Sequence, residues 1–151
     1  MQNQFLKKYL FVTALLLMVS CRVMLIGAYD AVTDMSIQKI QNDVSALLVR
    51  IENNITDNNT ADNKYQNFKS AYENIEGELQ SLQIRTRALP KYQTVTDQLV
   101  PFDSTIHKLE RFHKLGFNVS DTGALRVIKQ TIEFDFKQMI ILQNGLKRKT
   151  S

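Results

Sequence analysis

The chain has 151 residues, 44% of them hydrophobic, with five glycines, two prolines and one cysteine. Its 19 lysines and arginines against 15 acidic residues give a formal charge of +4, and two of those cations, Lys7 and Lys8, lie in the first 20 residues. The remaining +2 excludes the strongly basic surface of a nucleic-acid-binding domain, so we expect no nucleic-acid partner. Apolar residues recur at helical spacing over residues 34–149. We therefore expect a single all-α domain.

Residues 1–21 have the order of a bacterial lipoprotein signal. Lys7 and Lys8 form a basic start, an apolar run fills residues 9–19, and Ser20 directly precedes Cys21. The segment resembles a lipobox in which Met18 replaces the usual leucine, and the flexible thioether side chain of methionine adapts to a leucine pocket. We predict a signal peptide over residues 1–20 and lipid attachment at Cys21.

Two other interpretations of the leader stay open. Apolar residues resume after Arg22, so residues 9–28 are long enough to cross ~30 Å of hydrocarbon as an uncleaved helix. Arg22 would then lie inside the membrane at a cost of ~2.5 to 3.5 kcal/mol. Secretion as a cleaved soluble protein requires an A-x-A-like site, which the leader lacks.

A processed Cys21 would carry three acyl chains, which hold a protein on a membrane without further residues. This predicts a membrane-anchored, periplasm-facing protein of the bacterial cell envelope. Arg22 occupies the position where many inner-membrane lipoproteins carry aspartate, so the outer membrane is slightly favoured. Residues 21–33 lack the Gly, Ser and Pro of a flexible stalk, so we expect either a short membrane-proximal tether or an extension of the first helix.

Four amphipathic segments predict an antiparallel up-down-up-down four-helix bundle over residues 34–149, behind the signal helix. We expect the first helix to run from about residue 34, capped by Thr33 or Asp34, to about residue 54. The second runs from about residue 61 to Ala88. Apolar residues at intervals of three and four form the seams of these two helices: Ile37, Ile40, Val44, Leu47, Leu48, Ile51, Ile55, Tyr65, Phe68, Tyr72, Ile75, Leu79 and Leu82.

The third helix contains Pro101, which a helix accommodates easily only in its first turn. We expect this helix either to begin near Pro101 or to have a bent extra turn from Thr94, and to end at Gly116. The fourth helix begins after Ser120 or Asp121 and runs to about residue 147, and Phe134 and Phe136 widen its seam. The seams of the last two helices contain Leu99, Phe102, Ile106, Leu109, His113, Leu125, Ile128, Ile132, Met139, Leu142 and Leu146.

Basic residues gather at Arg85, Arg87 and Lys91, and again near the end of the last helix. Cations near a helix C-terminus complement the macrodipole, and contact with an anionic lipid or sugar is the alternative use of such clusters. Arg85 and Arg87 differ by about 200° around a helix, so one can pair with an internal acid, with Asp135 as a possible partner, while the other faces solvent.

Glu110 and His113 form a Glu-x-x-His motif, the spacing by which one helix offers two ligands to a di-iron centre. That site requires the motif twice, and the chain has it once. The two histidines, His107 and His113, diverge by about 240° on a helix and cannot share an ion. We therefore expect no metal or other cofactor, with His113 bonded to a neighbour in a seam and Glu110 in solvent.

The chain has no Gly-rich phosphate loop and no G-x-S-x-G turn, and no nucleophile with a nearby histidine and acid can be identified, so we predict no enzymatic activity. Residues 29–34, 85–91 and 109–117 resemble a group of small, uncharacterised bacterial lipoproteins predicted to be helical. The resemblance implies an envelope location and a helical fold, and no activity.

These features together predict a lipid-anchored interaction or accessory subunit that binds an envelope protein. A carrier with a small hydrophobic ligand in the bundle interior is the alternative function.

Overall fold

A computed structural model describes residues 27–117 and 121–150. In this part of the chain four long helices form and no strand occurs, which confirms the predicted all-α class. The helices α2 (Ala31–Thr56), α3 (Lys69–Ala88), α4 (Gln93–Leu115) and α5 (Thr122–Thr150) lie side by side, with a short 3₁₀ turn, η1 (Tyr65–Asn67), before α3. Cys21 and the predicted signal helix lie outside the described residues.

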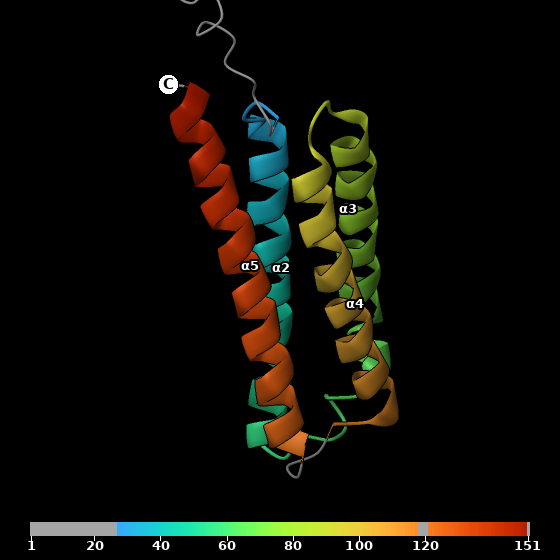
Figure 1. The fold of residues 1–151 in the computed structure, drawn as a ribbon. Coiled ribbons are helices and arrows are strands. Elements are labelled where there is room, and N and C mark those ends of the chain that lie inside the picture. Colours follow the sequence, from blue (N-terminus) through green and yellow to red (C-terminus); the bar gives the residue numbers. More distant parts are fainter. Residues whose placement is uncertain (1–26, 118–120, 151) are drawn as a thin grey trace, which may run out of the picture.

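The four helices form a bundle in which α2 and α4 each pack against both α3 and α5 (Figure 1). Each helix contributes one apolar stripe to a common core, as the three-four spacing predicts. Phe136 of α5 is buried in this core, whereas Phe134 is 59% exposed, so the prediction that Phe134 widens the seam was wrong. The largest fully buried side chains come from all four helices and from the turn before α3: Phe68, Phe102, Ile37, Ile40, Ile51, Ile75, Leu79, Leu82, Leu99, Leu109, Ile132 and Met139.

The first helix begins earlier than predicted, because Asp30 caps it rather than Thr33 or Asp34. Asp30 has an extended backbone, and its carboxylate accepts a hydrogen bond from the Thr33 backbone N–H at 2.9 Å. α2 therefore starts at Ala31, inside the segment expected to be a tether or extension, and Gly27 to Asp30 are not helical.

The second helix begins later than predicted, at Lys69 rather than near residue 61. Between Asp57 and Phe68 the side chains of Asn59 and Asn67 bond to nearby groups: the Asn67 amide donates to the carbonyls of Ala61 and Asp62 at 3.2 and 3.1 Å. Such local bonds offer the backbone an alternative to helix. Tyr65 and Phe68 keep their apolar contacts with the core from a turn and a helix cap.

The third helix is continuous from Gln93 to Leu115, so the predicted start near Pro101 was wrong, and the alternative of helical structure from about Thr94 agrees with the observed start. Val95 and Leu99 are fully buried in the turns before the proline, while Pro101 itself faces solvent. Burial of those side chains holds the first two turns in place despite the missing N–H donor of Pro101. Gly116 ends the helix with φ of 91°, and Phe117 is buried beside it, which confirms the predicted terminator.

The two ends of the bundle have different structures. At one end the Gly27 N–H donates to the Lys91 carbonyl at 2.9 Å, and Tyr29 packs against the last turns of α5. We call this the Tyr92 end; it comprises residues 27–34, 85–92 and 146–150. At the other, the His113 end, the Asn63 amide donates to the Phe117 carbonyl at 3.4 Å, so residues 57–67 lie beside residues 113–117.

Candidate functional site

The Tyr92 end is the part of the described structure closest in sequence to Cys21. Tyr92 is buried, and its hydroxyl donates to the Ala28 carbonyl at 2.7 Å. A Cβ atom at Gly27 would overlap the Tyr92 ring and would lie 2.8 Å from the Pro90 carbonyl oxygen. The chain therefore joins the bundle through a close backbone contact with the α3–α4 connection that only glycine permits.

Asp30 connects this contact to α3. Its Oδ2 accepts from the Arg85 Nε at 2.7 Å and its Oδ1 from the Arg85 Nη2 at 2.8 Å, while the Thr33 hydroxyl donates to Oδ2 at 2.7 Å. The hydrogen bonds from Arg85 hold the pKa of Asp30 well below its usual range. A bidentate pair of this kind fixes geometry as well as charge.

The prediction that one of the two arginines pairs with an internal acid is confirmed for Arg85, but the acid is Asp30 and not Asp135. Arg87 is exposed. Asp135 is half-buried on α5, and its Oδ2 has no hydrogen-bond partner among the described residues. Burial raises the pKa of that carboxyl.

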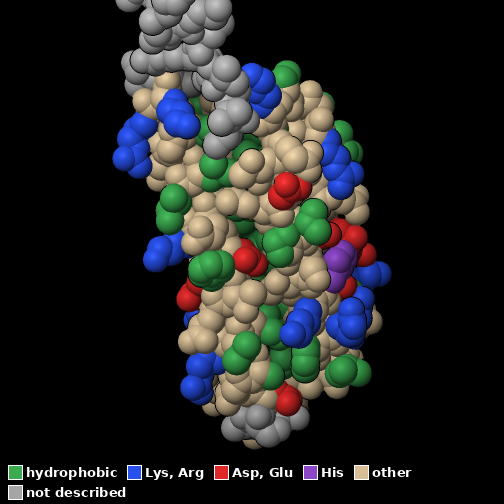
Figure 2. Space-filling model, in the orientation of Figure 1, with side chains coloured by type: hydrophobic (Ala, Val, Ile, Leu, Met, Phe, Trp, Pro, Cys, Tyr) green, Lys and Arg blue, Asp and Glu red, His purple; other side chains and the backbone are tan. Residues whose placement is uncertain are grey.

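Both basic clusters of the sequence meet at the Tyr92 end. Arg87 and Lys91 lie at the end of α3 and in the α3–α4 connection, and Lys147, Arg148 and Lys149 form the last turn of α5; all five side chains are exposed. The Lys147 ammonium lies 5.7 Å from the centroid of the Tyr29 ring. Lysine and arginine side chains surround this end in the space-filling view (Figure 2). The fold thus joins two clusters that are more than 50 residues apart in sequence.

Glu110 and His113 lie toward the opposite end and have separate partners. His113 is buried; its Nδ1 lies 3.0 Å from the Tyr72 hydroxyl and its Nε2 lies 2.8 Å from the Asn63 carbonyl oxygen. A carbonyl only accepts, so Nε2 carries the proton and Nδ1 accepts from Tyr72. Neither ring nitrogen offers a lone pair to a metal ion in this arrangement.

Glu110 is half-buried rather than solvated as expected. Its Oε1 accepts from the Tyr65 hydroxyl at 2.7 Å and from the Lys114 ammonium at 2.9 Å. Burial alone would raise the pKa of Glu110, but these two hydrogen bonds lower it. Among residues 27–117 and 121–150 no group of three or more His, Cys, Asp or Glu side chains could hold a metal ion.

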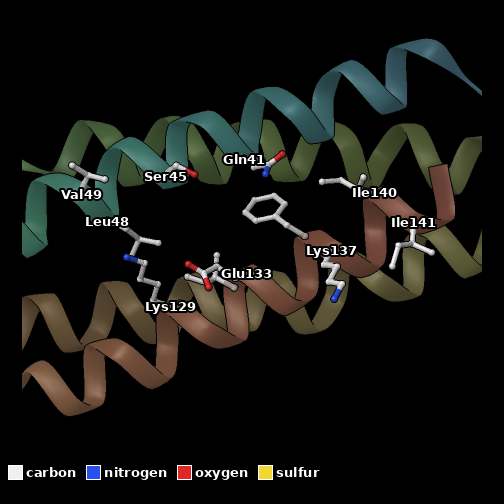
Figure 3. Close-up of a pocket in the computed structure, with 11 residues that line it drawn as sticks. Gln41, Ser45, Leu48, Val49, Lys129, Glu133, Lys137, Ile140 and Ile141 are labelled. Atoms are coloured by element: carbon white, nitrogen blue, oxygen red, sulfur yellow. The ribbon is translucent and has the colours of Figure 1, made fainter. Parts of the chain in front are cut away.

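Space for a ligand lies outside the core. The space among the central core side chains, which include Ile37, Leu79 and Phe102, leaves no room for a water molecule. An open groove of about 380 Å³ lies between α2 and α5 (Figure 3). Its lining is mostly apolar, with Leu48 and Ile140 from the two helices, and Lys129, Glu133 and Lys137 lie along it.

Comparison of the chain with protein-family models, curated proteins and solved structures found no match. In the part of the chain that the structure describes, no helix has both the length and the apolar character needed to cross a membrane.

Sequence analysis missed two features of the Tyr92 end. The cap of α2 has a local signal, because Asp30 stands three residues before Thr33, whose N–H and hydroxyl both bond to it. The grouping of the two basic clusters has no local signal, because it depends on which helix ends meet.

Proposed function

We propose that this protein is a non-enzymatic, lipid-anchored protein of a bacterial cell envelope, attached through an acylated Cys21 and acting as an interaction or accessory subunit for an envelope partner. The main support is the cluster of exposed cations at the Tyr92 end, where the chain that follows Cys21 reaches the bundle. Gly27 is six residues beyond Cys21, so a lipid on Cys21 would hold this end within about 20 Å of the bilayer.

Charge and geometry support an orientation in which the Tyr92 end faces the bilayer. Anionic lipid headgroups attract nearby lysines and arginines by about 1 kcal/mol each. Arg87, Lys91 and Arg148 are exposed and come from α3, the α3–α4 connection and α5, so three separate segments contribute cations to this end. Asp30 does not compete for them, because Arg85 already neutralises it.

The proposal includes the helix topology, the membrane location and the partner that the sequence predicts. The helices alternate in an up-down-up-down order, so the start of the bundle and its C-terminal helix end both lie at the Tyr92 end. The family of small lipoproteins that the chain resembles adds support for an envelope location, and Arg22 favours the outer membrane. The proposed partner binds the bundle away from the bilayer.

The test is the mass of the mature N-terminus, measured on protein purified from membranes. We expect a chain that begins at an acylated Cys21 and a Cys21→Ser variant that is not processed. The control Ser20→Gly keeps a small residue before the cysteine and should be processed normally. An intact Met1 with membrane association retained in Cys21→Ser would overturn the proposal and favour the uncleaved transmembrane anchor.

A carrier is the second candidate, with its ligand in the groove between α2 and α5 rather than in the bundle interior, where the core side chains leave no room. Native mass spectrometry of protein extracted from membranes distinguishes the two functions. A retained hydrophobic mass that is lost in Ile140→Trp, which fills the groove, would favour a carrier. A chain that retains no such mass would favour the interaction subunit.

A further inference from the structure

α5 has a second apolar stripe on the side away from the core. Val127, Phe134 and Ile141 are 60%, 59% and 53% exposed, whereas the core stripe of the same helix is buried. Neighbouring residues of this stripe are seven positions apart. Seven residues make almost two full turns of helix, so each side chain is rotated by only about 20° from the one before it. The three side chains therefore form one straight line about 21 Å long. Isolated exposed apolar residues are ordinary, whereas these three form a line that repeats once per heptad, with polar residues such as Gln130 and Gln138 between them.

The outer face of α5 is symmetric about Phe134. Val127 and Ile141 stand seven residues to either side, Gln130 and Gln138 stand four, and Gly123 and Gly145 stand eleven. At 100° per residue all six lie within about 40° of the direction of Phe134. The face therefore presents nearly the same series of side chains when read from either end.

No close contact inside the monomer requires glycine at the two glycine positions on this face. A Cβ atom at Gly123 or Gly145 would meet nothing within 4 Å. Glycine in a helix costs up to about 1 kcal/mol relative to alanine. Positions of this kind allow close approach of a second helix, and here they flank the apolar stripe at both ends.

Symmetry of this type matches an isologous interface, in which one surface patch binds its own copy about a two-fold axis. In an antiparallel pair of α5 helices centred on Phe134, the two Phe134 side chains meet on the axis. Val127 of each copy then faces Ile141 of the other. The stripe also continues toward α2 through Ile141, which lines the groove together with Val49, so the apolar area exceeds the three side chains alone.

The charged residues beside the stripe favour the same arrangement. Lys137 and Glu133 are exposed and lie on one flank of the stripe, about 60° and 100° from Phe134. An antiparallel two-fold axis places this flank opposite the same flank of the second copy. Measured along the helix axis, Lys137 of one copy is then about 3 Å from Glu133 of the other. Two complementary pairs result. In a parallel pair Glu133 would face Gln138, and the two Lys137–Glu133 pairs would not form.

We propose that this face of α5, comprising Gly123, Val127, Gln130, Phe134, Gln138, Ile141 and Gly145, binds the same face of a second copy of the chain in an antiparallel homodimer. The two Tyr92 ends then point in opposite directions. A dimer lying along a bilayer keeps both within reach of it, since the six residues from Cys21 to Gly27 span up to about 20 Å. The pairing itself does not depend on the lipid anchor.

Cysteine cross-linking of the full-length chain tests both the partner and the orientation. We expect Phe134→Cys to form a disulfide-linked dimer on mild oxidation. Val127→Cys and Ile141→Cys should cross-link efficiently only when the two variants are mixed. Val100→Cys on α4 is the matched control, because Val100 is 55% exposed outside the proposed face. The unsubstituted chain controls for Cys21. Efficient cross-linking of Val127→Cys with itself would overturn the antiparallel arrangement.

Sedimentation of the detergent-solubilised chain tests the energetics. We expect Phe134→Glu to weaken dimerisation at least tenfold and Val100→Glu to leave it unchanged. Lys137→Glu should also weaken it, and the double variant Glu133→Lys with Lys137→Glu should restore it, because the charges are then exchanged. A chain that stays monomeric at 0.1 mM, or a Phe134→Cys variant that cross-links only to another protein, would overturn the proposal.

Discussion

Asp30 combines two functions in one carboxylate. It caps α2 through the Thr33 backbone N–H and binds the Arg85 guanidinium of α3 with both oxygens. We predict that Asp30→Ala lowers the free energy of unfolding by about 1 to 3 kcal/mol, because a cap is lost and Arg85 loses its acceptor. Urea unfolding of the full chain followed by circular dichroism measures this change.

The control for this variant is Asp43→Ala on the same helix. The Asp43 side chain is 41% exposed, and its ion pair with Lys39 is a surface i,i+4 contact, which contributes little. We expect its unfolding curve to match that of the unsubstituted chain. Equal destabilisation by Asp30→Ala and Asp43→Ala would show that the cap and the Arg85 pair add nothing beyond an ordinary surface charge.

His113 makes stability depend on pH. Burial lowers the pKa of His113 below its ordinary value of about 6.5. The unfolded chain therefore binds more protons than the folded chain as pH falls below about 6.5, and the folded state loses stability in that range. Protonation would also remove the acceptor that Tyr72 uses. Arg50, Glu110 and Lys114 are the charged groups around this cluster.

We predict that the urea concentration at the midpoint of unfolding decreases as the pH is lowered from 7.5 to 5. His113→Gln should make this decrease smaller. His107→Gln is the control, because His107 is exposed on the same helix beside Asp103. Asp30 also makes stability depend on pH, but in a separate range. The pKa of its carboxyl is lowered in the folded state, so the stability that it contributes is lost below about pH 3.8. If the unsubstituted chain, His113→Gln and His107→Gln all lose stability equally between pH 7.5 and pH 5, the assignment to His113 is wrong.

At the scale of elements, α4 shows how burial overrides propensity. Pro101 lies inside the helix, where proline costs about 3 kcal/mol. We predict that Pro101→Ala stabilises the protein by about 1 to 2 kcal/mol, since the gain is partly offset by the greater freedom of the unfolded chain. The measurement is thermal or urea unfolding. Val100→Ala, at an exposed neighbouring position, should change stability much less.

Sequence patterns predicted the helical segments better than their boundaries. Three-four spacing identified the buried face of each helix, because side chains three and four residues apart share one side whatever the tertiary context. The starts of α2 and α3 differed from expectation, as did one of the two starts expected for α4. At residues 57–68 local bonds of Asn59 and Asn67 prevent an early start of α3, and at Pro101 buried neighbours prevent a late start of α4.

At the scale of the molecule, the two basic clusters form one charged end. We predict that the full-length chain reconstituted in anionic phosphatidylglycerol vesicles melts at a higher temperature than in neutral vesicles at low salt. The triple variant Arg87→Glu, Lys91→Glu and Arg148→Glu should lose this increase, because each cation near an anionic surface contributes about 1 kcal/mol. Salt at 0.5 M should remove the increase in the unsubstituted chain by screening.

The matched control reverses three exposed cations at the His113 end: Lys64→Glu, Arg111→Glu and Arg126→Glu. This variant has the same net charge as the first, so it separates the position of charge from its amount. Both triple variants are compared in a Phe134→Glu background, which prevents the antiparallel pairing, and this variant should keep the stabilisation by anionic vesicles. If both triple variants lose it equally, the Tyr92 end does not face the bilayer.

The sequence by itself determined the helical class, the apolar seams and the glycine terminator at Gly116, and it predicts a leader that ends at Cys21. These features depend on residues close together in the chain, where the period of a helix or the order of a signal is visible. Only the tertiary structure decided that Asp30 is the partner of Arg85, that both nitrogens of His113 are occupied, and that two distant basic clusters share one end. These outcomes depend on contacts between helices separated by 40 residues or more, and their register is set by packing of the whole core.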